Sequence, residues 1–304
     1  MSASAPPAVT SGHFVQVAAD VRLHYASCGA PGAPLMVFLH GFPEFWYAWR
    51  ALLPAFGERF HAVAPDLRGY NLSDKPTDVR AYRASALVAD IDALVRGLGH
   101  ERCVLVAHDW GGAAAWSYAI AHPQRVARLV ILNSPHPVPF ARALAHDAAQ
   151  QAASQYMNWL RRPGSEAVLA RDGFARLDDF FLRLGGAAWF HGEVRDAYHA
   201  AWAQPGAIAG GVNYYRASPL YPPIGDDPGA ARLALAEDDF VVRAKTLVIW
   251  GDGDTALLPV LLDGLDRLVP DLRIVRLADA THWLVHEQPQ RIIREISGFV
   301  DDAA

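Results

Sequence analysis

An aspartate occupies the most chemically suggestive position in this chain. Residues 104–113 read VLVAHDWGGA, which places Asp109 between an apolar run and two glycines. Residues 103–107 predict a buried parallel strand, and the small residues at 111–115 allow a helix to begin after a sharp turn, as in a nucleophile elbow. A carboxylate there attacks carbon and forms an alkyl ester, whereas a serine takes an acyl group. The residue type therefore indicates chemistry on strained or activated alkyl electrophiles.

A second interpretation of Asp109 is structural. Aspartate is a favoured N-cap, so Asp109 could cap a helix over residues 110–121 without doing chemistry. Short motifs match by chance. The choice between the two interpretations therefore depends on whether further reactive residues follow in a consistent order.

Length and composition restrict the class of protein. The 304 residues are 52% hydrophobic and carry a formal net charge of −5, which predicts a soluble globular enzyme with one core plus an inserted module. Residues 1–7 lack the features of an export signal, and no apolar run approaches the roughly 20 residues of a membrane span. We therefore expect neither export nor a membrane anchor.

The remaining composition excludes several partners. Cys28 and Cys103 are the two cysteines and lie in or beside predicted strands, so we expect buried thiols in a reducing compartment, the cytoplasm. The chain lacks the basic clusters of nucleic-acid-binding proteins. It also lacks a His, Cys or carboxylate cluster with metal-ligand spacing, so we expect no metal and no organic cofactor.

Short β-rich runs alternate with helical patterns, which is typical of an α/β sheet. After residue 137 the pattern changes to helices, predicted over residues 140–159 and 174–202, and a Pro- and Gly-rich linker over 218–229 leads back to strands. We expect a sheet core from residues 1–136 and 236–304 and a helical cap domain from 137–235. The predicted strands cover residues 21–26, 35–39, 60–64, 103–107, 129–132, 246–250 and 273–277.

Four motifs together carry a family resemblance. In chain order they are HGFPE at residues 40–44, DLRGYNLSDKP at 66–76, HDWGG at 108–112 and HW at 282–283. This set resembles the α/β-hydrolase fold epoxide hydrolases, whose close relatives are the haloalkane dehalogenases, and the similarity spans nearly the whole chain after residue 12. The resemblance implies a mostly parallel sheet flanked by helices, an inserted helical lid, and conversion of an epoxide and water to a vicinal diol.

The resemblance also implies a set of catalytic roles. The backbone N–H groups of Phe42 and Trp110 would form an oxyanion hole, a type of interaction worth about 3 kcal/mol per donor; alternatively, Gly41 and its neighbouring proline are simply turn residues. His282, in the loop after the last predicted strand, would be the base that activates water. The chain has 13 histidines, and His108 is expected to orient a loop instead.

The carboxylate partner of His282 has two candidates. Asp252 and Asp254 both follow the predicted strand at residues 246–250. The family places its acid where Asp254 lies, and Asp252 then braces the turn. The chain order of nucleophile, acid and base is that of this hydrolase class.

The lid is expected to hold the leaving oxygen. An epoxide opens to an alkoxide, a poor leaving group, which an acid must protonate or hydrogen-bond. The segments 154–164 and 211–216 resemble the two lid segments that carry the family's tyrosine pair, and the correspondence falls on Tyr156 and Tyr215. Tyr214 remains the alternative to Tyr215, and packing aromatics are the alternative for both positions.

Two other functions compete with this one. A haloalkane dehalogenase also places tryptophan after its nucleophile, so Trp110 does not discriminate, and a non-catalytic ligand-binding protein would be expected to have a broken triad. The absence of arginine at positions 110 and 113 disfavours a small acidic substrate. Trp46, Trp159 and Trp189 predict an apolar substrate pocket for an aryl or alkyl epoxide. The expected partners are the epoxide and water, with a homodimer as an open alternative.

Overall fold

A mixed sheet forms the centre of the molecule. The computed structural model describes residues 7–183 and 186–302, and within them one sheet has eight strands in the order β1-β2-β4-β3-β5-β6-β7-β8. β1 and β2 are antiparallel to each other and β2 is antiparallel to β4, while all remaining neighbours are parallel. The strands are β1 (Thr10–Ala18), β2 (Val21–Cys28), β3 (Leu35–Leu39), β4 (His61–Pro65), β5 (Cys103–His108), β6 (Val126–Leu132), β7 (Thr246–Gly251) and β8 (Leu272–Leu277).

Helices cover both faces of this sheet, because its central strands are apolar on both sides. Met36 and Phe38 of β3 pack with residues of α1 (Leu53–Gly57) and α13 (Pro289–Asp301). Val37 and Leu39 face the opposite way and belong to the core cluster that also contains residues of α2 (Ala84–Gly97), α3 (Asp109–Ala121) and α11 (Leu265–Leu268). The alternation follows from the two-residue period of a strand. The predicted fold class, a mostly parallel sheet flanked by helices, is confirmed.

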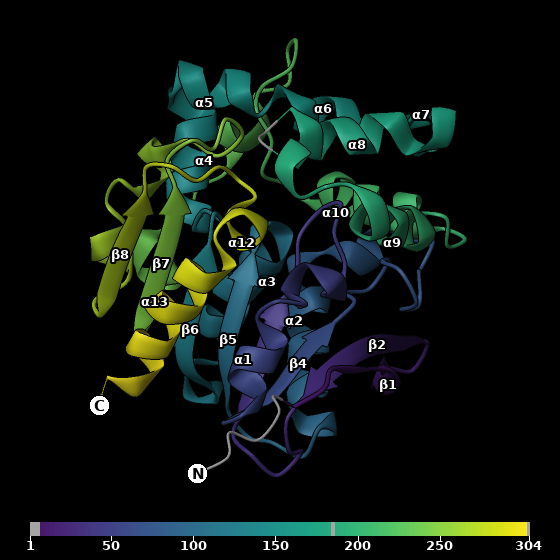
Figure 1. Ribbon diagram of the computed structural model, residues 1–304. Helices are drawn as coiled ribbons and strands as arrows, with labels where there is room; N and C mark the ends of the chain where they lie inside the picture. The colour runs from purple at the N-terminus through teal and green to yellow at the C-terminus, as the bar shows by residue number, and fades with distance from the viewer. Residues whose placement is uncertain (1–6, 184–185, 303–304) are drawn as a thin grey trace.

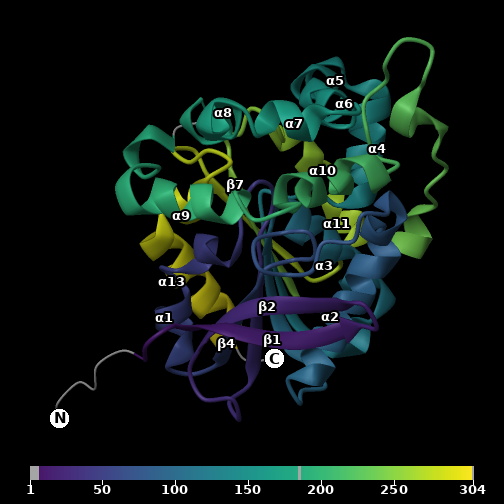
Figure 2. The ribbon, with the colours of Figure 1, turned by 90° about the vertical axis from the view of Figure 1, so that its right-hand side faces the viewer.

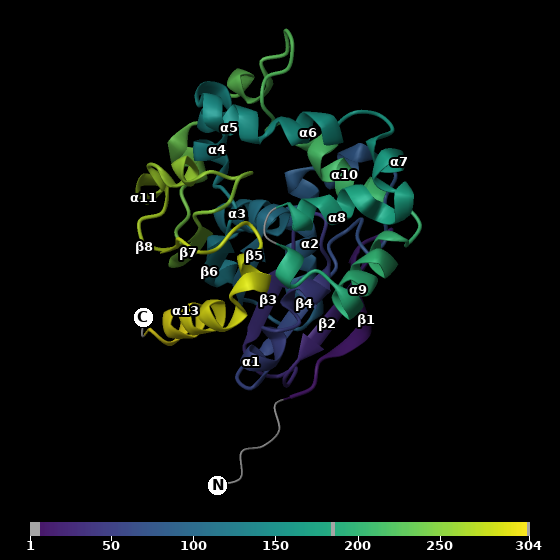
Figure 3. The same cartoon turned by 45° about the horizontal axis from the view of Figure 1, so that its top comes forward.

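The segment between β6 and β7 forms a helical layer above the carboxyl ends of the parallel strands (Figure 1). The turned view in Figure 2 places the same helices above β1 and β2. Figure 3 brings this layer forward, with α6, α8 and α10 close together. Its helices are α4 (Pro137–His146), α5 (Ala148–Ala153), α6 (Gln155–Leu160), α7 (Ser165–Leu169), α8 (Ala175–Leu182), α9 (Gly192–Trp202) and α10 (Ala207–Ala217).

Short helical segments occupy many of the connections. α12 (Leu284–Glu287) follows the loop after β8. Among the described residues, none of the helices is long and apolar enough to cross a membrane. The 3₁₀ segments are η1 (Trp46–Trp49), η2 (Val79–Tyr82), η3 (Pro123–Arg125), η4 (Asp172–Phe174), η5 (Gly186–Ala188), η6 (Gly229–Arg232), η7 (Glu237–Phe240) and η8 (Pro259–Leu262).

The structure differs from the prediction in two respects. The long helices predicted over 140–159 and 174–202 are broken into shorter ones; Asp147, for example, accepts a hydrogen bond from the Gln150 N–H and so starts a new helix. β1 was missed because this edge strand is mostly exposed and lacks a continuous apolar run. Two parts of the prediction lie outside the described residues. They are residues 1–6, where no export signal is expected, and residues 184–185 in the second predicted helix.

The turn from β5 into α3 brings two backbones into close contact. A Cβ atom added at Gly111 would lie 2.3 Å from the Leu39 carbonyl oxygen and 2.5 Å from that of His40. Only glycine therefore allows α3 to begin directly against the end of β3. The first turn of α3 and the loop after β3 are held together by this approach.

We expect Gly111→Ala to lower the free energy of unfolding by about 3 kcal/mol, because the added methyl group meets backbone that cannot rotate away. Gly298→Ala is the matched control: Gly298 lies within α13 and its added Cβ meets nothing within 4 Å. The free energy of unfolding of that variant should rise by about 0.5–1 kcal/mol, because alanine favours a helix more than glycine does. Urea denaturation measures both, and equal stabilities for the two variants would contradict the assigned contact.

Candidate active site

Asp109 lies at the elbow between β5 and α3 in a strained backbone conformation. Its φ is +47°, in the left-handed region that side chains rarely adopt. The Ser134 hydroxyl donates to its carbonyl at 2.7 Å, and the Phe42 N–H donates to its Oδ1 at 2.7 Å. A Cβ at Gly41 would lie 2.3 Å from the Asp109 side chain. These contacts hold the carboxylate at the edge of the sheet, with Oδ1 in the position expected for an oxyanion.

His282 lies between two carboxylates. Its Nδ1 is 2.7 Å from Asp254 Oδ2, and its Nε2 is 3.8 Å from Asp109 Oδ2. Asp254 is fully enclosed by donors, since its Oδ1 accepts the backbone N–H groups that follow it in the loop, at 2.8 and 2.9 Å. Its Oδ2 also accepts an N–H of the Asn133 side chain at 2.7 Å. The structure thus brings together the three residues predicted as nucleophile, acid and base.

The charges around His282 control its protonation. Burial by itself lowers the pKa of this imidazole, but the Asp254 carboxylate, with further contributions from Asp109 and Glu44, outweighs it and raises the pKa to about 9. Burial raises the pKa of Asp254, yet the charge of His282 and the hydrogen bonds to Asp254 lower it overall. At neutral pH the imidazole is therefore a cation, held in that form mainly by Asp254, and loss of the Asp109 charge would lower its pKa.

Two tyrosines face Asp109 from the lid. Tyr156 on α6 and Tyr215 on α10 line the same cavities as Asp109, with their rings 6.0 Å apart. Burial, followed by neighbouring negative groups that include Asp109, raises the pKa of both hydroxyls. Both therefore keep their protons at neutral pH. Tyr214 also lines the first cavity, but its hydroxyl is engaged, since it donates to the Arg68 carbonyl at 2.9 Å.

Two cavities meet at the nucleophile. The first, of about 280 Å³, is lined mainly by apolar groups such as Leu87, Phe140 and Met157. The second, of about 430 Å³, contains His282 and reaches Trp159 and the charged side chains of α8. Asp109 and both lid tyrosines line each cavity. A ligand bound at Asp109 would thus extend into an apolar space on one side and a more polar one on the other.

Comparison with known proteins agrees with this geometry. A family model described as alpha/beta hydrolase fold matches residues 34–289. Mouse epoxide hydrolase 4 is 32% identical over 289 residues, covering 93% of this chain and 77% of the relative. Mouse epoxide hydrolase 3 is 34% identical over 307 residues, covering 98% and 77%. The chain belongs to the epoxide hydrolases of the α/β-hydrolase fold.

A solved structure supports the same membership. The crystal structure of Bacillus megaterium epoxide hydrolase in complex with an inhibitor superposes with a TM-score of 0.86 at 34% identity, covering 95% of this chain and all of that one. This epoxide hydrolase chain therefore matches its relatives in the core and in the lid.

Two of the predicted pocket residues lie outside the two cavities that contain Asp109. Neither Trp46 nor Trp189 lines the two cavities that contain Asp109, whereas Trp159 lines the second. Trp46 is the first residue of η1, and its backbone N–H donates to the Asp66 carboxylate at 2.9 Å. The Trp189 ring stacks on His286 at 3.9 Å. Both were assigned by residue type, which does not distinguish an aromatic that packs within the protein from one that faces a cavity.

A buried carboxylate behind His282 was not found from the sequence. Glu44 contacts three side chains: His108 Nδ1 at 3.1 Å, His286 Nε2 at 2.6 Å and the Tyr198 hydroxyl, which donates at 2.8 Å. The other ring nitrogen of His108 lies 2.9 Å from the His282 carbonyl oxygen. Burial raises the pKa of Glu44, but the two histidines outweigh it and hold the pKa well below its usual value.

Asn133 was also missed. It adopts φ +35° at the end of β6, and its side chain bonds Asp254 and the backbone of Gly251. The available signal was an Asn directly after a buried strand, at the sheet edge where the other polar residues gather. Among the described residues, no cluster of three or more His, Cys, Asp or Glu side chains could hold a metal ion.

The raised pKa of His282 predicts a pH-dependent stability. Its pKa is about 9 in the folded protein and 6.5 ordinarily, so the folded state binds this proton more tightly. The stabilisation is complete below pH 6.5 and is lost as the pH rises through about 9. Between about pH 6 and pH 9 the wild type should lose about 3 kcal/mol more than His282→Gln, measured by urea denaturation. Equal losses of unfolding free energy in the two proteins would show that His282 is not a cation in the folded state.

Proposed function

We propose that this protein hydrolyses an apolar aryl or alkyl epoxide to a vicinal diol through a covalent ester on Asp109. The observation that carries the proposal is a carboxylate nucleophile facing two buried, protonated tyrosine hydroxyls across a shared cavity. A carboxylate supplies the attack on carbon, and the hydroxyls supply the acid that an epoxide oxygen needs.

In the first half-reaction, Tyr156 and Tyr215 donate hydrogen bonds to the oxirane oxygen. Asp109 Oδ2 attacks a ring carbon, the carbon–oxygen bond breaks, and one tyrosine proton passes to the alkoxide; solvent then restores that hydroxyl. Oδ2 is the attacking atom because Oδ1 is held by the Phe42 N–H. The product is a hydroxyalkyl ester, and the negative charge beside His282 has been consumed.

In the second half-reaction, loss of the neighbouring charge lowers the pKa of His282, which releases its proton to solvent while Asp254 holds the ring in place. The neutral imidazole takes a proton from water, whose oxygen attacks the ester carbon. The resulting oxyanion is bound by the N–H groups of Phe42 and Trp110. Collapse of this intermediate expels the diol oxygen, which takes the proton back from His282. The water oxygen therefore enters Asp109 first.

The shape of the site supports an apolar substrate. The first cavity, about 280 Å³ with largely hydrocarbon walls, suits an aryl or alkyl substituent, and Trp159 would contact the substrate from the second. We propose residues 137–235 as the lid domain over a core made of 1–136 and 236–304. A cytoplasmic location and a homodimer stay predictions.

The alternative of a haloalkane dehalogenase is less well supported. Halide binding would use the indole N–H of Trp110, but the Trp110 ring packs against Tyr215 in this structure. The rings of the two residues lie 5.0 Å apart, edge to face. The tyrosine pair has no task in halide release, since a halide leaves as an anion.

Styrene oxide and 1-bromobutane, offered in parallel to the purified protein, separate the two activities. We expect diol by chromatography and no released bromide, because the tyrosine hydroxyls can assist departure of an alkoxide. Asp109→Asn is the blank for both assays. Bromide without diol would reverse the assignment and make Trp110 a halide ligand.

Trapping the ester tests the division of roles. His282→Gln should accumulate a covalent adduct on Asp109, with a mass increase equal to that of the epoxide, because water is no longer activated. Asp109→Asn should show no adduct. In the wild type, a single turnover in ¹⁸O-labelled water should give unlabelled diol, and label in that first diol would exclude the covalent route.

A further inference from the structure

We propose that Arg161 is a positioning residue that sets the distance between the two lid tyrosines. It follows Tyr156 on the C-terminal side of α6 and binds the backbone of Tyr215 on α10. The inference rests on the proposed role of the tyrosine pair in ring opening. Arg161 lines neither of the two cavities, so its proposed role acts through the backbone of Tyr215 and not through contact with the substrate.

The contacts of Arg161 are directed at one helix end. Its Nη1 donates to the carbonyl oxygen of Tyr215 and, at 2.9 Å, to that of Ser218. Its guanidinium also lies 3.7 Å from the centre of the Tyr221 ring. The half-buried Arg161 has no carboxylate partner among the described residues, and burial lowers its pKa. The guanidinium therefore stabilises the C-terminal end of α10, where the carbonyl dipoles favour a cation.

The sequence explains why this helix end needs a donor. In a continuing helix the Tyr215 carbonyl would accept the N–H of residue 219, and that of Ser218 would accept the N–H of residue 222. Both of those residues are prolines, which have no N–H. The two carbonyls bound by Arg161 are thus those that the prolines leave without a helical partner. Arg161 supplies the missing hydrogen bonds from another helix.

A second arginine makes the reverse connection. Arg216, the residue after Tyr215, donates to the Arg162 carbonyl at 2.9 Å and pairs with Glu166. Each of the two lid segments therefore sends an arginine to the backbone of the other, and both connections involve Tyr215 or the residue after it. We call Arg161 and Arg216 the lid clamp. Two opposed connections fix both sliding and rotation of α6 against α10, which one connection would not.

The geometry that the clamp fixes is the one that ring opening uses. Both hydroxyls must reach a single oxirane oxygen, so the rate of ring opening depends on the 6.0 Å separation of the Tyr156 and Tyr215 rings. A displacement of about 1 Å at a reacting group can cost on the order of 100-fold in rate. Ester hydrolysis uses His282 and the oxyanion hole, all in the core, and is independent of the clamp.

Arg161→Met tests the assignment, because methionine keeps the aliphatic stem and removes both hydrogen bonds. In single-turnover experiments with styrene oxide we expect ester formation to slow by about 10- to 100-fold, while ester hydrolysis is unchanged. Arg161→Lys, which keeps a donor of similar reach, should recover part of the loss. Should the Met variant fold poorly, the Lys variant carries the same comparison, with ester formation below wild type and hydrolysis equal to it.

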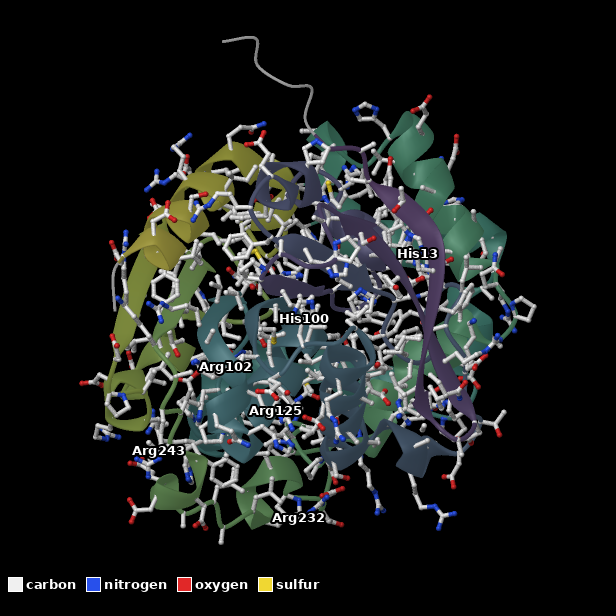
Figure 4. All side chains as sticks on the ribbon, turned by 90° about the horizontal axis from the view of Figure 1, so that it is seen from below. His13, His100, Arg102, Arg125, Arg232 and Arg243 are labelled. Atoms are coloured by element: carbon white, nitrogen blue, oxygen red, sulfur yellow. The ribbon has the colours of Figure 1, made fainter. Side chains whose placement is uncertain are left out.

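Arg232→Met is the matched control. Arg232 contacts the same Tyr221 ring at 5.0 Å and pairs with Asp227, and within the described part of the chain it makes no hydrogen bond to α10. It lies at the periphery of the molecule in Figure 4. This variant should form the ester at the wild-type rate. Equal slowing in Arg161→Met and Arg232→Met would mean that the Tyr221 cluster matters only for stability, and would overturn the positioning role.

A double-mutant cycle separates this inference from the proposed function. If Arg161 acts through the Tyr215 hydroxyl, Arg161→Met should slow ester formation much less in a Tyr215→Phe background than in the wild type. Independent, multiplicative losses would contradict the positioning role. If Tyr215→Phe alone left ester formation unchanged, the proposed ring-opening acid would be wrong, whatever the arginine variants showed.

Discussion

The hydrogen bond from the Phe42 amide to the Asp109 carboxylate is the contact on which the site depends. It joins the loop after β3 to the elbow after β5, two neighbouring strands whose carboxyl ends meet at one edge of the sheet. The nucleophile is held at φ +47°, a conformation that persists only because surrounding contacts enforce it. Gly41 and Gly111 permit those contacts, since a side chain at either would collide with its neighbour. The strain at Asp109 is balanced by close packing in the core.

Charge is the second constraint. The site contains one cationic imidazole between two carboxylates, and the charge of Asp109 adds to the larger effect of Asp254 in raising the pKa of His282. Alkylation of Asp109 removes one of these negative charges and so lowers the pKa of His282, and the same imidazole then becomes a base. Electrostatics therefore favours the base form of His282 once the ester has formed. Asp254 keeps its charge throughout, because Asn133 and backbone N–H groups stabilise its ionised form.

Much of the core was predictable because its signals are local. β3 was predicted with its observed bounds from a continuous apolar run, and the elbow at Asp109 was evident from one strand, one carboxylate and two glycines. The exposed β1 carried no such signal. The choice between Tyr214 and Tyr215 was also beyond a local pattern, because adjacent helical residues point in different directions and only tertiary packing shows which of them faces the nucleophile. The bonds of Glu44 join residues from four distant segments, so no spacing rule could find them.

These long-range contacts are what join the lid to the core. The proposed nucleophile and base lie at the edge of the sheet, whereas the proposed ring-opening acids, Tyr156 and Tyr215, lie on helices inserted between β6 and β7. The Tyr198 hydroxyl of α9 donates to Glu44, and Glu44 contacts His108, which bonds the carbonyl of His282. Tyr214 of α10 donates to the backbone of Arg68 in the core. Buried hydrogen bonds of this kind are costly to break singly, because each lost partner leaves a polar group without water. These hydrogen bonds therefore fix the position of the lid relative to Asp109. The packing of the lid helices against one another then determines where the two tyrosine hydroxyls lie relative to the substrate.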